Sequence, residues 1–331
     1  MNTSCLLVRD RDSVADRYSL WLSCHGFESR SVAHLDRLKV EADRRISFGF
    51  EFPSVDDRTE ASRRVALARG KLQQAGYATP VVSDEGFETE VRAEFERLPS
   101  NQRTVVGVDI SSMSRSRISA LLVAFADQGQ SKSCDIDLIY FPGSYESHKH
   151  EFEPLEKFGP CHPRLSGWPA EPDLPLAVLL GLGTEPRRAD GVVEMLEPDI
   201  LALYMPLGDE PEYLAELREE NRRILEVGGE PISYSLRDPA AVYASLVATA
   251  TRLVERSRLV LVPLGPKQFA ALAVAAALTL GSEVGVWKAS SGRGVEPVDV
   301  QARGEPVVMR LSMEPRPTEL NHPGFRGDRL V

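Results

Sequence analysis

The chain has 331 residues and a formal net charge of −10, a length that suits two domains of about 150 residues each. The acidic excess argues against nonspecific DNA binding, which requires clustered lysines and arginines. The longest apolar stretch, residues 269–280, is too short to span a bilayer, and the charged residues 9–12 do not fit a signal peptide. We therefore expect a cytoplasmic protein without membrane contact.

Short apolar runs alternate with stretches of helical periodicity through the first 141 residues. The predicted strands are residues 18–24, 45–50, 78–83, 104–109 and 134–141. The predicted helices between them are residues 31–41, 57–75, 87–98 and 114–126. This alternation is typical of a mostly parallel sheet with helices on both faces.

The second half repeats this order. Its predicted strands are residues 176–182, 199–204, 231–235, 258–263 and 283–288, and its predicted helices are residues 187–196, 212–227, 239–255 and 268–280. The fold class is therefore α/β, with two tandem Rossmann-like lobes, each a doubly wound and mostly parallel sheet, related by internal duplication. The expected division is a first lobe (1–145), a linker (146–174), a second lobe (175–302) and a C-terminal tail (303–331).

Polar loops follow the first and fourth strands of each half. A Gly-x-Glu turn containing Glu28 follows the first strand, and its counterpart contains Glu185. The fourth strands lead into Asp109-Ile-Ser-Ser and into Pro263-Leu-Gly-Pro-Lys. In a doubly wound sheet the first and fourth strands are neighbours, and ligands bind beyond their carboxyl ends. We therefore expect the loops to form a ligand site.

The residue types in these loops suit a phosphate group. Serines and arginines at a helix start offer hydroxyls, N–H groups and guanidinium groups, although serine there also serves as an ordinary helix cap. Glycine allows close backbone approach to a ligand, and lysine supplies a cation. The candidate ligand-binding residues are Glu28, Arg30, Ser111, Ser112, Arg115, Glu185, Arg188, Gly265 and Lys267. Neither GxxxxGK[ST] nor GxGxxG occurs, which disfavours a P-loop nucleoside triphosphatase or a dinucleotide dehydrogenase, and no cofactor is expected.

Catalytic and metal-binding roles receive less support from the sequence. Glu28, Asp109 and Glu185 are the candidate general acids or bases, but carboxylates beside arginines in a turn also form ordinary salt bridges. The sequence therefore does not decide whether the chain is an enzyme. The only group of metal-ligand types is His148, His150, Cys161 and His162. Its spacing matches no common zinc site, so no metal is expected.

Two segments carry a resemblance to a known family. Gly265-Pro266-Lys267, followed by a helix of small apolar residues from Phe269, is similar to the loop of the CRISPR-associated Rossmann fold (CARF) domain. Ser111-Ser112-Met113-Ser114-Arg115 is a more distant counterpart, and two fused units resemble the SAVED domain. The resemblance implies sensing of cyclic or linear oligonucleotide messengers in prokaryotic antiviral signalling.

The leading hypothesis is a regulatory protein that binds a nucleotide-type small ligand between its lobes. No effector domain is recognisable in the sequence, so we expect a separate protein partner, or a homodimer. One alternative is an enzyme that hydrolyses or transfers a nucleotide-like substrate. Another is a non-catalytic assembly subunit whose lobes only pack against a partner.

Overall fold

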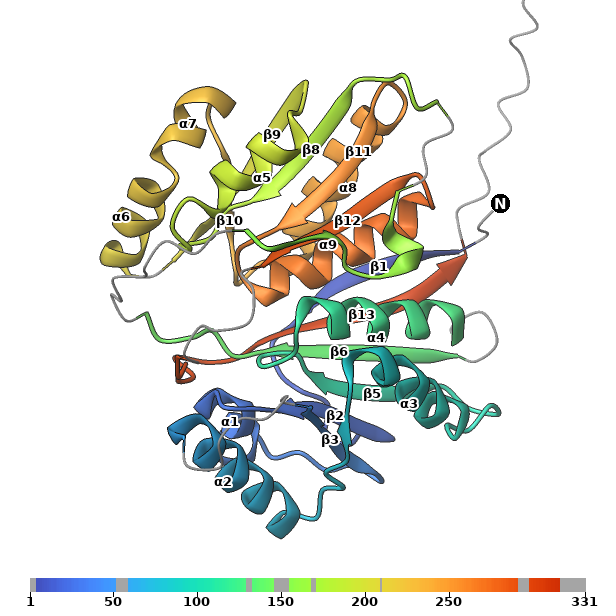
Figure 1. Cartoon of the computed structure of the whole chain (residues 1–331). Coiled ribbons are helices and arrows are strands. Elements are labelled where there is room, and N and C mark those ends of the chain that lie inside the picture. Colours follow the sequence, from blue (N-terminus) through green and yellow to red (C-terminus); the bar gives the residue numbers. More distant parts are fainter. Residues whose placement is uncertain are drawn as a thin grey trace, which may run out of the picture.

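The computed structural model describes residues 4–51, 59–128, 133–145, 155–167, 171–208, 210–290 and 298–315. These residues form two mostly parallel sheets with helices on both faces (Figure 1). The predicted α/β class with two Rossmann-like lobes is confirmed.

Within the described ranges, the first sheet has seven strands. Their spatial order is β1 (Ser4–Arg11), β13 (Val307–Pro315), β6 (Cys134–Tyr140), β5 (Thr104–Asp109), β2 (Leu20–His25), β3 (Arg45–Phe50) and β4 (Val81–Val82). The strands from β6 to β4 are parallel to one another, whereas β13 is antiparallel to both β6 and β1. The first and fourth predicted strands of this half, β2 and β5, are therefore neighbours.

The second sheet follows the same plan. Its described strands lie in the order β10 (Ile232–Ser235), β9 (Ile200–Leu207), β8 (Leu176–Gly181), β11 (Arg258–Pro263), β12 (Val284–Ser290) and β7 (Lys157–Pro160). Only β7 is antiparallel to its neighbour. Because β8 and β11 are adjacent, both sheets have their switch point at the predicted pair of strands.

The described α-helices connect these strands. They are α1 (Ala33–Arg37), α2 (Glu60–Gln74), α3 (Asp84–Glu96), α4 (Arg115–Gln128), α5 (Arg188–Leu196), α6 (Pro211–Glu220), α7 (Arg222–Gly228), α8 (Pro239–Val254) and α9 (Lys267–Leu280). The single helix predicted at 212–227 is divided at Asn221, which has a nonhelical backbone and whose buried amide donates to the Gly183 carbonyl at 2.8 Å. None of the described helices is long and apolar enough to cross a membrane.

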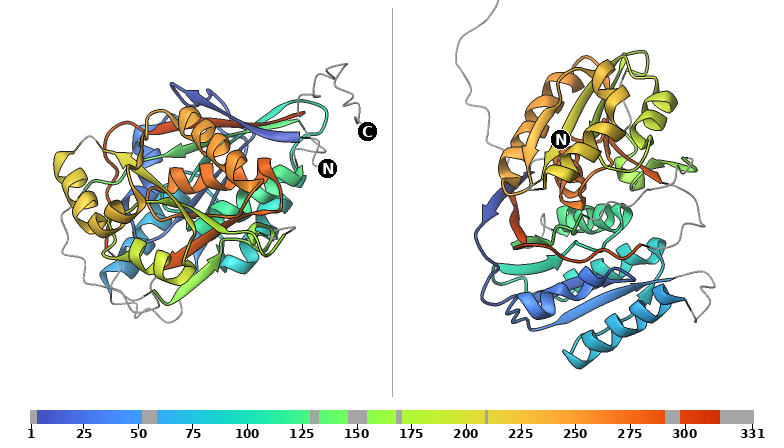
Figure 2. Two further views of the ribbon diagram at one scale, coloured as in Figure 1. Left: turned by 90° about the horizontal axis from the view of Figure 1, so that it is seen from above. Right: turned by 90° about the vertical axis from the view of Figure 1, so that its left-hand side faces the viewer.

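One hydrophobic cluster runs through both lobes. Alternate residues of β2 face opposite sides of the sheet, as strand geometry requires: Leu20 and Leu22 pack in the same cluster as α3 and α4, while Trp21 packs with α2 residues. The cluster around α4 continues into α8 and α9 of the second lobe. Figures 1 and 2 show α4 and α9 side by side between the two sheets. Six alanines in α9 (Ala270, Ala271, Ala273, Ala275, Ala276 and Ala277) are almost completely buried.

Two segments expected outside the lobes contain sheet strands. Part of the expected tail forms β13, which lies between β1 and β6, and part of the expected linker forms β7 at the edge of the second sheet. Arg310 in β13 makes two hydrogen bonds, of 2.7 and 2.8 Å, with the fully buried carboxylate of Asp137 in β6. A buried carboxylate needs such a partner, so β13 is anchored by charge as well as by backbone pairing.

We expect that shortening a buried side chain of β13 will destabilise the whole first lobe. Leu311 is completely buried, so Leu311→Ala should reduce the free energy of unfolding by about 2–5 kcal/mol. Val298→Ala is the control, because Val298 is 41% exposed and should change stability by about 0.5 kcal/mol or less. Urea unfolding measures both. Equal stability of the two variants would mean that β13 is not part of the folded sheet.

Candidate functional site

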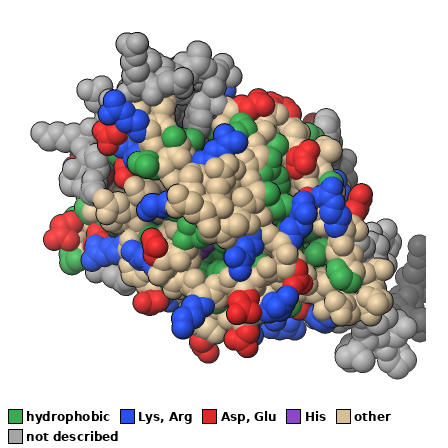
Figure 3. Space-filling model, turned by 90° about the horizontal axis from the view of Figure 1, so that it is seen from below, with side chains coloured by type: hydrophobic (Ala, Val, Ile, Leu, Met, Phe, Trp, Pro, Cys, Tyr) green, Lys and Arg blue, Asp and Glu red, His purple; other side chains and the backbone are tan. Residues whose placement is uncertain are grey.

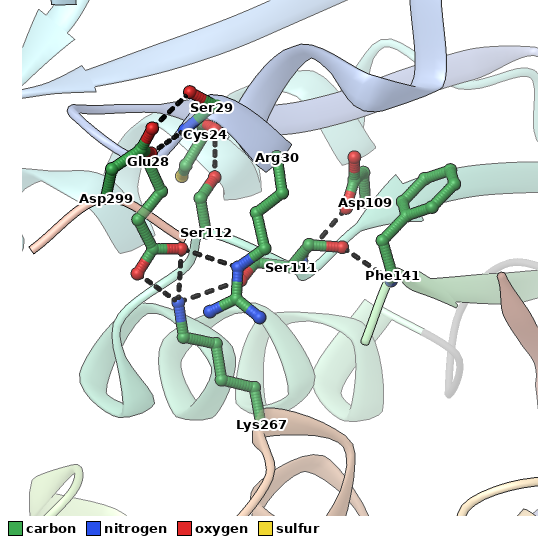
Figure 4. Close-up of polar contacts among 10 residues, drawn as sticks. All are labelled: Cys24, Glu28, Ser29, Arg30, Asp109, Ser111, Ser112, Phe141, Lys267 and Asp299. Carbon is green, nitrogen blue, oxygen red and sulfur yellow. Dashed lines mark hydrogen bonds and ion pairs between the residues drawn. The ribbon is translucent and has the colours of Figure 1, made fainter. Parts of the chain in front are cut away.

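A group of opposite charges lies where the switch points of the two sheets face each other (Figure 4). Glu28 follows β2, and its carboxylate accepts from Arg30 Nε at 2.7 Å. Lys267, the first residue of α9, reaches across from the second lobe and places Nζ 3.4 Å from both Glu28 oxygens. One carboxylate thus lies between two cations from different lobes.

Burial and neighbouring charges shift the pKa values of both Lys267 and Glu28. Burial lowers the pKa of Lys267 from 10.5 to about 8, and Arg30 and Arg115 add to the lowering, while Glu28 only partly offsets it. Burial alone would raise the pKa of Glu28, but the attraction of Lys267 and Arg30 outweighs it and leaves that pKa below its ordinary value. Glu28 is therefore ionised at neutral pH, and Lys267 can lose its proton in mildly alkaline solution.

A second cation crosses the interface in the opposite direction. Arg115, the first residue of α4, donates to the carbonyl oxygens of Leu264 and, at 3.0 Å, Gly265 in the second lobe. Lys267 Nζ correspondingly donates to the Ser111 carbonyl oxygen of the first lobe at 2.8 Å. Arg115 and Lys267 begin the equivalent helices of the two lobes. In each lobe, the cation that begins the helix after the fourth predicted strand therefore donates to a loop carbonyl of the other lobe.

The loop around Gly265 is packed too tightly for a side chain. A Cβ atom at Gly265 would lie 2.3 Å from the Leu182 carbonyl oxygen. The glycine therefore serves close packing of two strand ends, and it brings the Leu264 and Gly265 carbonyls within reach of Arg115.

A cavity of about 430 Å³, which we call the basic cavity, lies at the carboxyl ends of the first sheet. Its lining cations are Arg115, Lys157, Lys267 and Lys288. Its two acids, Glu28 and Asp84, already pair with cations: Asp84 lies 2.8 Å from Arg117 Nε. The remaining lining residues are Gly26, Phe27, Phe50, Ser112, Met113, Ser114, Ser116, Ala289 and Ser290. The cavity therefore carries a local positive surplus on a chain whose net charge is negative.

A second cavity of about 440 Å³, which we call the tyrosine cavity, lies at the carboxyl ends of the second sheet. Tyr140, Tyr145 and Tyr213 line it, together with loops that follow β8, β9, β10 and β11. Its charged residues are balanced, with three cations and three acids: Arg30, Arg237, Arg303, Glu185, Glu210 and Asp299. The two cavities occupy equivalent positions in the duplicated fold but differ in charge.

The candidate ligand-binding residues divide between these cavities instead of lining one cleft. Glu28, Ser112, Arg115 and Lys267 line the basic cavity. Arg30, Glu185 and Gly265 line the tyrosine cavity. The ion pairs of Glu28 with Arg30, which lines the tyrosine cavity, and with Lys267, which lines the basic cavity, lie between the two sets of residues.

Two candidates lie outside both cavities. Ser111 is completely buried, and its hydroxyl accepts from the Phe141 backbone N–H at 2.8 Å. The backbone N–H of Arg188 donates to the Glu185 carbonyl at 3.2 Å, at the start of α5. The candidates were taken from the loops after the first and fourth strands, and so they do not include Lys288, which lies in β12, or the three tyrosines, which lie in or near β6 and α6.

Among the catalytic candidates, Asp109 holds the backbone in place. Its carboxylate is 2% exposed and accepts from the Ser111 backbone N–H at 2.9 Å. The other oxygen lies 3.0 Å from His34 Nδ1. These contacts fix the loop after β5, and Asp109 lines neither cavity. Of the three candidate acids or bases, only Glu28 and Glu185 face a cavity.

The group of metal-ligand residue types is only partly described. His148 and His150 lie outside the described residues. Cys161 is buried, which raises the pKa of its thiol to about 11, and His162 Nε2 lies 2.8 Å from Glu88. Over the described part of the chain, no cluster of three or more His, Cys, Asp or Glu residues could hold a metal ion.

The low pKa of Lys267 gives stability a pH dependence. Between the folded value of about 8 and the ordinary value of 10.5, the unfolded chain binds more protons at this residue, so its contribution to stability rises with pH. We expect wild type to gain stability relative to Lys267→Met between pH 7.5 and 9.5, as measured by urea unfolding. Lys71→Met, at an exposed position, is the control. A constant difference between wild type and Lys267→Met would contradict the shift.

Comparison with known proteins does not define the ligand. No family model and no curated protein sequence matches the chain. The two cavities and the residues that line them are the features of the described chain that bear on function.

Proposed function

We propose that the chain is a regulatory protein that binds a nucleotide-type anion in the basic cavity. The supporting observation is the charge of this cavity: four cations line it against two carboxylates, and one of these, Asp84, pairs with Arg117, which is not among the lining residues. A phosphate group would neutralise this surplus and accept charge-assisted hydrogen bonds. The lining therefore favours an anionic ligand over a neutral or cationic one.

The start of α4 adds to the attraction for phosphate. The Ser114 hydroxyl accepts from the Arg117 backbone N–H at 3.1 Å and so caps the helix. A fourteen-residue helix directs the positive end of its dipole at this point. Lys288, from the end of β12, donates to the Ser116 hydroxyl and thereby stays beside the helix start. Cations of both lobes thus converge on one helix terminus.

Nonpolar parts of the cavity suit the rest of a nucleotide. Phe27 and Phe50 line it, and aromatic rings stack on bases. On the molecular face in Figure 3, acidic and basic side chains are interspersed, so that face has no continuous basic stripe of the kind that tracks a DNA backbone. A small ligand fits this local surplus better than long nucleic acid does.

The finer proposal is a sensor of oligonucleotide messengers in prokaryotic antiviral defence that acts with a separate effector partner. Its support is the resemblance of the loops at Ser111–Arg115 and Gly265–Lys267. The crossing of Arg115 and Lys267 between the lobes offers a physical route to a response. An anion that attracts either cation would weaken its contact with the opposite lobe.

We expect inorganic pyrophosphate and at least one nucleotide or oligonucleotide to bind. Charge-assisted hydrogen bonds to a phosphate each contribute about 1.5–3 kcal/mol, so Lys288→Ala and Lys267→Ala should each weaken binding at least about tenfold. Binding should also weaken between pH 7.5 and 9, since Lys267 loses its proton there. Isothermal titration calorimetry measures each affinity.

One control and one further cavity variant complete this experiment. Lys71→Ala removes an equal charge from an exposed position in α2 that does not line the cavity, and it should leave the affinity unchanged. Lys157 is exposed, so Lys157→Ala tests the cavity without disturbing the partly buried ion pair of Glu28 and Lys267, and it should also weaken binding. Absence of binding to any phosphate compound, or equal affinities in all four variants, would refute the proposal.

A further inference from the structure

The tyrosine cavity contains polar groups whose hydrogen-bonding capacity is unused. The Glu185 carboxylate makes no hydrogen bond or ion pair with any described residue. It does lie close to Tyr213: burial raises the pKa of the Tyr213 hydroxyl most, and Tyr140 and then Glu185 add to the rise. The Tyr213 hydroxyl also has no hydrogen-bond partner in the described ranges. Carboxylate oxygens accept hydrogen bonds, so a matching ligand must donate.

A third unused group lies beneath the same cavity. Tyr234 is 7% exposed, and its hydroxyl is buried without a hydrogen-bond partner among the described residues. It lies 3.9 Å from the position that a Gly265 Cβ atom would take, and Gly265 lines the cavity. Native proteins rarely leave buried polar atoms unsatisfied. The Tyr234 hydroxyl therefore points to an incomplete polar site.

The wall of the cavity suits a flat ring. The Tyr145 and Tyr213 rings meet edge to face with centroids 5.8 Å apart, and the Tyr145 hydroxyl is held by Glu216. Rings fixed in this way present a preformed aromatic surface. The cavity is also balanced in charge: Arg303 pairs with Glu210, and Arg30 pairs with Glu28. A phosphate would meet no surplus of cations here.

From these observations we propose that the tyrosine cavity is a second binding site, separate from the basic cavity, for an uncharged nucleoside. The base would pack on the tyrosine rings, and ribose hydroxyls or base N–H groups would donate to Glu185. This inference goes beyond the proposed function, because it concerns the other lobe and a ligand without phosphate.

Titration calorimetry with adenosine, guanosine, cytidine and uridine tests the proposal. We expect at least one nucleoside to bind with an affinity that changes little with salt. Glu185→Gln and Tyr213→Phe should each weaken this binding at least about tenfold, since the first replaces an accepting oxygen with a donor and the second removes a hydroxyl. Glu212→Gln is the matched control: it removes the same charge from an exposed neighbour of Tyr213 that does not line the cavity.

The outcomes separate this site from the basic cavity. Lys288→Ala should leave nucleoside binding unchanged, and Glu185→Gln should leave pyrophosphate binding unchanged, which also shows that the variant is folded. The inference is overturned if no nucleoside binds, if binding survives both Glu185→Gln and Tyr213→Phe, or if Lys288→Ala abolishes it. Pyrophosphate binding without nucleoside binding would overturn this inference alone, and the reverse result would overturn the proposed function alone.

Discussion

The arrangement of the molecule depends on two cations that cross between the lobes in opposite directions. A cation taken out of water must find acceptors, or its burial is strongly unfavourable. Arg115 finds them in the carbonyls of Leu264 and Gly265, and Lys267 finds them in Ser111 and Glu28. Since both cations begin the helices packed at the interface, these contacts fix the register of α4 on α9. The same contacts place each lobe's switch point beside the other lobe.

The duplicated halves have kept their topology and changed their chemistry. The basic cavity and the tyrosine cavity lie at corresponding strand ends, and each takes side chains from the opposite lobe. One has a surplus of cations, whereas the other has balanced charges and a tyrosine wall. Duplication followed by loop divergence explains how one fold offers two different environments, because the loops can change while the sheets keep their packing.

Local patterns in the sequence predicted the parallel strands well, because each depends on a short apolar run between helices. Strands β3, β5 and β11 have the same bounds as their predictions. The antiparallel strands β1, β7 and β13 were not predicted as such, since their pairing involves partners far away in the chain. The contact of Glu28 with Lys267 spans 239 positions. Such a contact follows from lobe packing, and so does the division of the expected cleft into two cavities.

The position of β13 between β1 and β6 has a consequence for synthesis. A ribosome releases β1 and β6 well before it has made β13, so the first sheet stays split while the whole second lobe is translated. The second lobe, whose strands all lie between Lys157 and Ser290, can close its sheet earlier, although folding during translation usually starts with the N-terminal domain. During that interval β1 and one edge of β6 lack the strand that pairs with both of them, and an unpaired strand edge can mispair or bind a chaperone.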